Sequence, residues 1–213
     1  MEGFTKKEKT LIKKLNTPAK MQDFLNGLRF NFEKQNGRTV ETLRSPLFAL
    51  RAKSAHCFEG ALLGAYILSQ HGSRPYLMHL KAQKEDYDHV IAPFKIGKFW
   101  GALSKTNHAV LRYREPVYGN IRELAMSYFH EYFLNNGQKT LRQYSALLNL
   151  NTVKKLASPT GGNWATSEKD LWSIDKALDK VKHYDMVPKS HVKKLRRAEK
   201  IEIEAGKLTE WKS

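Results

Sequence analysis

The chain has 213 residues, of which 41% are hydrophobic and 27% are charged, a composition that is typical of a folded domain and excludes a disordered chain. Its formal net charge of +16 predicts attraction to polyanions such as nucleic acid, anionic membrane surfaces or acidic substrates. Its single cysteine cannot form an intramolecular disulfide, and no signal peptide or apolar run of roughly 18 to 20 residues is present, so we expect a cytoplasmic protein without a membrane span.

The N-terminal part of the chain is expected to be helical. Residues 1–14 are rich in lysine and predict a loose helix or a disordered segment. Thr17 and Pro18 predict a helix start, because threonine is a good N-cap and proline at the first helical position loses no hydrogen bond. This helix is expected to end at residues 35–37. Its apolar residues recur at helical spacing and should face the core: Met21, Phe24, Leu25 and Leu28.

The centre of the chain predicts one helix followed by antiparallel strands. Residues 57–70 have a helical pattern that His71 and Gly72 should close. Gly60 and Gly64 each cost about 1 kcal/mol relative to alanine in a helix, so their presence predicts the close approach of another element. Strands are expected at residues 75–80, 89–94, 99–103 and 109–113, with a hairpin at Gly97.

The C-terminal part mixes helical and irregular patterns. Residues 121–133 predict an amphipathic helix, residues 140–150 are ambiguous, and residues 158–163 predict a loop. Ser167 and Asp170 have the spacing of a capping box ahead of a helix at 171–181. Residues 189–213 form a basic tail with weak helical periodicity.

The order of these elements predicts an α+β fold rather than a doubly wound sheet. The helix that carries Cys57 should pack on an antiparallel sheet, with extra helices at both ends of the chain. Three segments are expected: a basic lead segment (1–16), an α+β domain (17–157), and a helical, basic C-terminal extension (158–213) that packs on or trails the same domain.

Cys57 is a candidate nucleophile because it opens a predicted helix. Free N–H groups and the helix dipole favour a thiolate there, and such cysteines can have a pKa of roughly 3.5 to 7.5. His89 begins a strand after one intervening strand, so its imidazole could activate the thiol. The alternative is a small buried cysteine and a structural histidine. The helix-start position and the two glycines, which permit tight packing, favour the reactive interpretation.

Three segments in this region, residues 56–63 (HCFEGALL), 88–92 (DHVIA) and 97–102 (GKFWGA), resemble the transglutaminase-like superfamily. The resemblance covers about residues 54–113 and suggests a divergent, bacterial-type member with a papain-like cysteine fold. In that family a cysteine begins a core helix, a histidine begins a following strand, and an aspartate stands on the next strand, four residues after a tryptophan. The resemblance implies acyl transfer with Cys57 as nucleophile and His89 as base, and Trp100 is assigned to the substrate pocket.

The third position departs from this family pattern. Ser104, not aspartate, stands four residues after Trp100. A serine can accept the ring N–H of a histidine but carries no charge to stabilise an imidazolium. Asn107 offers the Cys-His-Asn arrangement of papain-like enzymes, or it is a turn residue.

Nearby carboxylates are the remaining candidates for this role. Asp86 and Asp88 lie in the turn before His89, although Asp88 would point to the opposite side of the strand from its neighbour. Glu59 is expected to face away from the thiol as a solvent-exposed or capping residue.

Three functions remain open. The first is a cysteine hydrolase or acyltransferase acting on an amide or ester bond of an unidentified peptide, amide or ester substrate. There, His89 takes and returns the proton, Ser104 or Asn107 orients its ring, and the Cys57 N–H plus an unidentified group stabilise the oxyanion. The second is an inactive binding or scaffold module of the same fold. The third is a basic nucleic-acid-associated protein.

No cofactor or metal site is expected. CxxC and HExxH motifs are absent, His56, His71, His79 and His108 form no metal pattern, and the Gly161-Gly162 pair lacks the lysine of a phosphate loop. The basic tail is interleaved with glutamates, which predicts nonspecific contact with polyanions rather than sequence-specific binding.

Overall fold

The computed structural model describes residues 1–32, 34–35, 38–153 and 163–210, and these form an α+β molecule around an antiparallel sheet. Within the described residues seven strands make this sheet, in the order β11-β9-β5-β6-β7-β8, with β10 also pairing with β5. The strands are β5 (Tyr76–Ala82), β6 (His89–Ile96), β7 (Phe99–Leu103), β8 (Arg114–Tyr118), β9 (Leu141–Ser145), β10 (Leu148–Asn149) and β11 (His183–Asp185).

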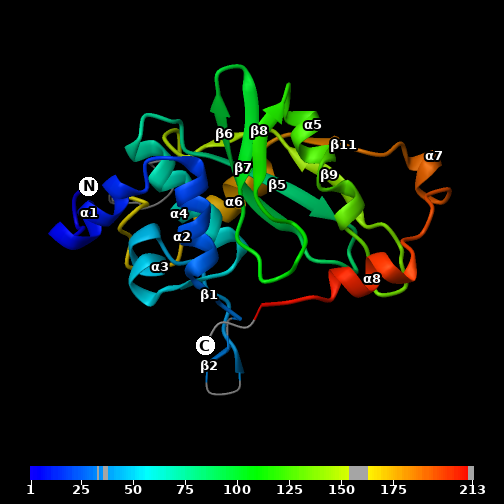
Figure 1. The fold of residues 1–213 in the computed structure, drawn as a ribbon, viewed down its shortest axis with the longest axis horizontal. Helices are drawn as coiled ribbons and strands as arrows, with labels where there is room; N and C mark the ends of the chain where they lie inside the picture. The colour runs from blue at the N-terminus through cyan, green and yellow to red at the C-terminus, as the bar shows by residue number, and fades with distance from the viewer. Residues whose placement is uncertain (33, 36–37, 154–162, 211–213) are drawn as a thin grey trace.

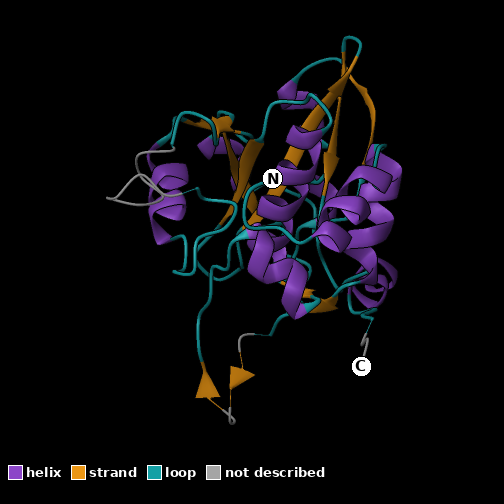
Figure 2. Ribbon diagram, turned by 90° about the vertical axis from the view of Figure 1, so that its left-hand side faces the viewer, coloured by secondary structure: helices purple, strands orange, loops and turns teal. Residues whose placement is uncertain are grey.

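Helices flank this sheet on both sides. Figure 1 shows α1 to α4 gathered on one side of the central strands, and α5, α7 and α8 on the other. The helices are α1 (Lys6–Lys14), α2 (Pro18–Gly27), α3 (Pro46–Ala52), α4 (Cys57–Gln70), α5 (Ile121–Met126), α6 (Trp172–Lys180), α7 (Lys189–Val192) and α8 (Lys200–Gly206), with a 3-10 turn, η1 (Phe129–Glu131). A small hairpin of β2 (Lys34–Gln35) and β3 (Arg38–Thr39) projects from the body (Figure 2). The predicted α+β class and the helix-on-antiparallel-sheet arrangement are confirmed.

The two faces of β6 lie against two separate cores, because successive side chains of a strand point to opposite sides. Val90 and Ala92 belong to the core shared with α4. Ile91 belongs to the other core, which contains Tyr128 and Tyr132. His89 alternates with Val90 and therefore lies on the side of the tyrosines.

The glycines of α4 are explained by close packing, as predicted. A Cβ atom on Gly60 would overlap the side chain of Lys105, and one on Gly64 would lie 3.1 Å from Leu103 Cδ1. The helix ends at Gln70 and is followed by Gly72 with a φ of 86°. The contact with Lys105 brings the loop after β7 against the first turn of α4.

The predicted strands at residues 75–80, 89–94 and 99–103 are confirmed as β5, β6 and β7. The strand predicted at residues 109–113 is wrong, because residues 104–113 form an irregular loop and the next strand begins at Arg114. At Leu111 the chain turns left-handed, with a φ of 59°. The N–H and C=O of Leu111 are both bonded to side chains and cannot join a strand ladder.

The N-terminal helices differ from the prediction in their ends. Residues 1–14 contain an ordered helix, α1, which begins with a capping box between Thr5 and Glu8. Thr17 caps α2 as expected. However, α2 ends at Gly27 rather than at residues 35–37, because the next residues form β1 (Arg29–Phe30), which pairs in parallel with β4 (Ser54–Ala55).

Three C-terminal expectations are corrected or resolved. The helix predicted at 121–133 is α5 followed by η1, and it breaks at Ser127, whose hydroxyl donates to the Leu124 carbonyl. The ambiguous residues 140–150 contain β9 and β10. The capping box is wrong: Asp170 Oδ1 accepts the Leu43 N–H, and α6 begins without a side-chain cap.

Some expectations lie outside the described residues. The predicted loop at 158–163, the domain boundary at 157/158 and the Gly161-Gly162 pair fall on or beside the undescribed residues 154–162. Among the helices that the structure describes, none has both the length and the apolar character needed to cross a membrane.

Candidate functional site

A cleft of about 780 Å³ lies where the N-terminus of α4 meets the start of β6 and the loop at residues 104–113. Cys57, His89 and Tyr132 are among the residues that line it. Cys57 is partly exposed and lines the cleft. This accessibility argues against the alternative of an inert, fully buried cysteine.

Cys57 occupies the first helical position of α4, as predicted. His56 is the N-cap: its Nδ1 lies 3.3 Å from the Phe58 nitrogen, and its backbone N–H donates to Glu59 Oε2 at 3.3 Å. The Cys57 N–H is one of the first four helical N–H groups, which have no carbonyl partner within the helix. Thus both the sulfur and a backbone donor of Cys57 stand at the positive end of the helix dipole.

The surroundings of Cys57 favour the thiolate. Burial alone would raise its pKa, but hydrogen bonds and positive charge from His56 and His89 outweigh burial and lower the pKa of Cys57 to about 5. Burial likewise opposes the charged form of His56, but the Cys57 thiolate, the Glu59 carboxylate and the Thr42 carbonyl raise the pKa of His56 to about 9. At neutral pH the sulfur is therefore anionic beside a positive partner.

His89 is oriented by a chain of hydrogen bonds that fixes its protons. The Ser104 hydroxyl donates to the Leu111 carbonyl at 2.5 Å, so its oxygen must accept from the ring of His89, whose Nε2 lies 2.8 Å away. Because Nε2 carries this hydrogen, Nδ1 is the nitrogen left to face the thiol as a base. Ser104 therefore selects the tautomer of His89, although it carries no charge.

The orienting serine is itself held in place from a distant helix. Gln22 of α2 donates from Nε2 to the Ser104 carbonyl at 2.7 Å and accepts the Ser104 N–H at 3.0 Å. On the other side, the Leu111 N–H donates to Glu131 Oε2 at 2.7 Å. The left-handed backbone of Leu111 costs about 1–2 kcal/mol for a non-glycine residue, and these bonds maintain it.

Glu59 does not face solvent, which corrects one of the two expectations for it. Its side chain is 0% exposed and pairs with Arg44 Nε at 2.7 Å. Burial would raise its pKa, but the hydrogen bonds and charge of Arg44, with the charge of His56, lower the pKa of Glu59 to about 2. The capping role is confirmed, and the carboxylate adds a negative charge behind His56.

The two turn carboxylates do not replace the missing aspartate. Asp88 points away from His89, as expected, and its carboxylate binds His79 Nε2 at 2.9 Å and the Ala82 N–H at 2.8 Å. Asp86 accepts a hydrogen bond from the Thr140 hydroxyl. The group at His89 Nε2 is therefore Ser104.

The structure separates two other predicted site residues: among the described residues, Asn107 lines the cleft and Trp100 does not. Asn107 is buried in the cleft wall, and its carbonyl accepts the N–H of Glu210 at 2.7 Å. Trp100 is not among the described residues that line the cleft. It lies near the other end of β7, where Lys95 sits over its ring and Tyr76 packs beside it.

The sequence interpretation also missed the C-terminal segment. After α8 the chain runs along the loop at 104–113, where the Ala109 N–H donates to the Leu208 carbonyl at 2.9 Å. Figure 1 shows this red segment leaving α8 and running back toward β1. Ile203 and Lys207 line the cleft, so the tail forms part of its wall.

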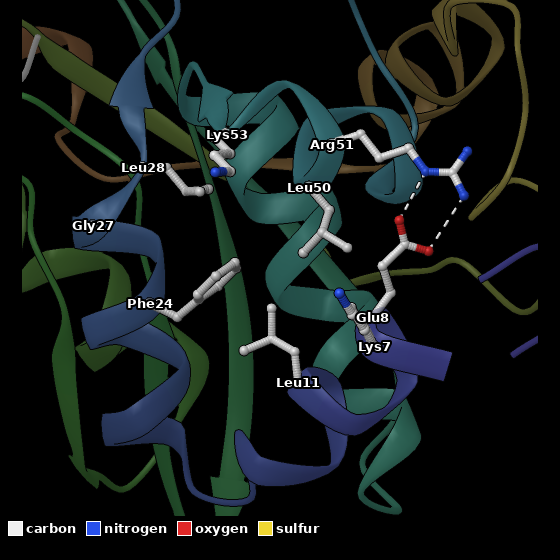
Figure 3. A pocket seen from close by; sticks show the side chains of 9 residues that line it. All are labelled: Lys7, Glu8, Leu11, Phe24, Gly27, Leu28, Leu50, Arg51 and Lys53. Carbon is white, nitrogen blue, oxygen red and sulfur yellow. Dashed lines mark hydrogen bonds and ion pairs between the residues drawn. The ribbon is translucent and has the colours of Figure 1, made fainter. Parts of the chain in front are cut away.

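A second hollow, of about 470 Å³, lies between α1, α2 and α3 (Figure 3). Phe24, Leu11 and Leu50 give it an apolar lining, and an ion pair between Glu8 and Arg51 lies at its edge. Neither a thiol nor an imidazole lines it, whereas the Cys57 cleft has both.

Within the residues that the structure describes, no group of three or more histidine, cysteine, aspartate or glutamate side chains is arranged to hold a metal ion. No protein-family model matches the chain, and no curated protein sequence matches it significantly.

Proposed function

We propose that this chain is a transglutaminase-like cysteine hydrolase or acyltransferase that acts on an amide or ester bond. The observation that carries the proposal is the continuous line of groups from Cys57 through His89 and Ser104 to the Leu111 carbonyl. The position of the cysteine at the head of α4, with the histidine at the start of β6, supports the resemblance to the superfamily. Ser104 at the end of β7 takes the place of the family's aspartate.

The reaction follows from the positions of these groups. The Cys57 thiolate attacks the carbonyl carbon, a C–S bond forms, and the carbonyl electron pair moves to oxygen. In the resting ion pair, the proton of the Cys57 thiol is held on His89 Nδ1. When the tetrahedral intermediate collapses, the leaving group departs with this proton. Water or an amine attacks the resulting thioester and gives its proton back to Nδ1, which restores the thiolate.

The two histidines have different roles in this scheme. His56 Nε2 lies 2.9 Å from the Thr42 carbonyl, which can accept its hydrogen, and the Cys57 thiolate and the Glu59 carboxylate favour the protonated ring. His56 therefore supplies positive charge beside the sulfur, whereas proton transfer belongs to His89.

The test uses p-nitrophenyl acetate, an activated ester that acylates exposed thiolates. We expect one acetyl group on Cys57 by mass spectrometry, and release of p-nitrophenolate beyond one equivalent as the thioester turns over. Faster release in the presence of an added primary amine would identify an acyltransferase, and an unchanged rate a hydrolase. A rate equal to that of Cys57→Ala, with no acetyl group on the wild-type cysteine, would refute the proposal.

A further inference from the structure

Tyr132 carries a hydroxyl group without a partner. The residue is only 3% exposed, and its Oη makes no hydrogen bond within the described part of the chain. Leaving a buried hydroxyl unsatisfied costs about 1–3 kcal/mol, so such a group calls for an explanation. Ser45, at the N-terminus of α3, is the other buried side chain with this property among those described.

Tyr132 itself belongs to the thiol site. Tyr132 lines the cleft together with Cys57 and His89, and it belongs to the core on the same side of the sheet as His89. Its backbone is fixed on both sides: its N–H donates to the Phe129 carbonyl at 3.4 Å, and its carbonyl accepts the Thr140 N–H at 3.0 Å. Core packing therefore holds the ring on this fixed backbone, and not a partner of its hydroxyl.

The electrostatic surroundings keep the hydroxyl protonated. Burial, and then the negative charges of Cys57, Asp86 and Asp88, raise the pKa of Tyr132 well above its ordinary value of 10. The phenol is thus a hydrogen-bond donor at any working pH. The negative charges named above act on it, but it has no acceptor among the residues that the structure describes.

We propose that the Tyr132 O–H is the second donor of an oxyanion hole whose first donor is the Cys57 backbone N–H. This inference rests on the proposed function. When the thiolate adds to the carbonyl, the electron pair that moves to oxygen creates a negative charge that these two donors stabilise. When the intermediate collapses, the pair returns to re-form the carbonyl, and both donors are released.

A donor that is already in place before the charge develops loses no energy in reorganising. The unsatisfied hydroxyl of the resting protein is therefore consistent with a group that gains its partner only during the reaction. This accounts for why an otherwise well-bonded core retains a buried phenol rather than a phenylalanine.

The test compares two reagents that consume the same thiolate. Acylation by p-nitrophenyl acetate develops an oxyanion, whereas alkylation by iodoacetamide is a displacement at a saturated carbon and develops none. For Tyr132→Phe we expect acylation of Cys57 to slow by about 100-fold, as when one oxyanion donor is removed. Alkylation should stay within about twofold, because the thiolate itself is unchanged.

Tyr128→Phe is the matched control. Tyr128 is also buried, precedes Tyr132 by one helical turn, and donates its hydroxyl to the Arg112 carbonyl at 3.1 Å. Its substitution should leave the ratio of acylation to alkylation unchanged.

Equal acylation rates in Tyr132→Phe and wild type, or an equal loss of both reactions, would overturn the inference. Acylation of the wild-type protein by p-nitrophenyl acetate tests the proposed function separately. Absence of wild-type acylation would refute the proposed function and this inference together, whereas wild-type acylation that Tyr132→Phe does not slow would refute this inference alone.

Discussion

Two histidine clusters lie on either side of the start of β6, and they differ in how completely their polar atoms are used. Asp88 and His89 are neighbours in the chain but point in opposite directions. Asp88 binds His79, and His79 Nδ1 lies 3.2 Å from His183 Nε2. His89 faces Ser104 and Cys57 instead.

Counting hydrogens shows that the His79 cluster is closed. His183 Nδ1 must donate to the Val181 carbonyl, 2.8 Å away, so its Nε2 can only accept. The two nitrogens of His79 are likewise both engaged, Nε2 with Asp88 and Nδ1 with His183. Every ring nitrogen in this cluster has a partner, and no nucleophile is present.

The Cys57 cluster is open by the same count. Cys57 is partly exposed and lines a cleft, and the Tyr132 hydroxyl has no partner within the described residues. A closed set of polar groups stabilises a fold, whereas an open set can bind or react with something else. The comparison therefore assigns structure to one cluster and chemistry to the other.

The largest expected difference between the clusters is in acyl transfer. His89→Ala should reduce the rate of p-nitrophenyl acetate turnover by about 10²–10⁴-fold, because it removes the general base. The matched variant His183→Ala removes a histidine from the closed cluster and should retain the wild-type rate. Similar losses in both variants would show that the distinction between the clusters is false.

The second difference is in the free energy of unfolding. Arg44→Met removes the nearest ion partner of the buried Glu59 carboxylate, which keeps only the more distant His56 at 3.8 Å among its described ion partners, and should cost about 3–5 kcal/mol in urea unfolding. Asp88→Asn breaks an ion pair whose carboxylate side chain is 39% exposed, so it should cost only about 1 kcal/mol. A smaller loss for Arg44→Met than for Asp88→Asn would contradict the buried network behind the thiol.

A smaller effect is expected from Ser104→Ala. Without the hydroxyl, His89 Nε2 and the Leu111 carbonyl both lose their partner, so the reactive tautomer is no longer selected. We expect acyl transfer to fall by about tenfold or more, as for the loss of an orienting group, with less effect on alkylation. An unchanged turnover rate would mean that Ser104 does not position the ring.

The smallest effect concerns the closed cluster and pH. Burial and the charge of His79 lower the pKa of His183. As pH falls below about 6.5, the unfolded chain binds a proton at His183 before the folded protein does, so stability falls. His183→Gln should remove this pH dependence. The change in the free energy of unfolding that it removes should be less than about 1 kcal/mol, because the side chain is partly solvated. Urea unfolding on both sides of this pH measures it, and an identical pH dependence in wild type and variant would contradict this.

The sequence predicted those features of the fold and the site that depend on local patterns. The helix start at Cys57 and the strand start at His89 followed from helical and strand periodicity. Ser104 was a candidate, beside Asn107, because the resemblance to the superfamily implies an orienting group four residues after a tryptophan. Strand β7 explains why Trp100 is not beside the thiol: four residues of strand separate it from Ser104 by about 13 Å.

Other features could not be predicted because they depend on residues far apart in the chain. Gln22 binds Ser104 across 82 positions, and no local signal marks it. The left-handed turn at Leu111 depends on the side chains of Ser104 and Glu131, which only the folded chain brings next to it. His56 was the exception: it stands next to Cys57, and its place as the residue before a predicted helix could have marked it as a cap.

The pH dependence of Cys57 alkylation tests the central claim most directly. If His56 and His89 hold the sulfur as a thiolate with a pKa of about 5, the rate constant for iodoacetamide should be nearly constant from neutral pH down to that region and fall only below it. A rate that instead falls about tenfold per pH unit below a midpoint near 8.5, as for a free cysteine thiol, would contradict the account.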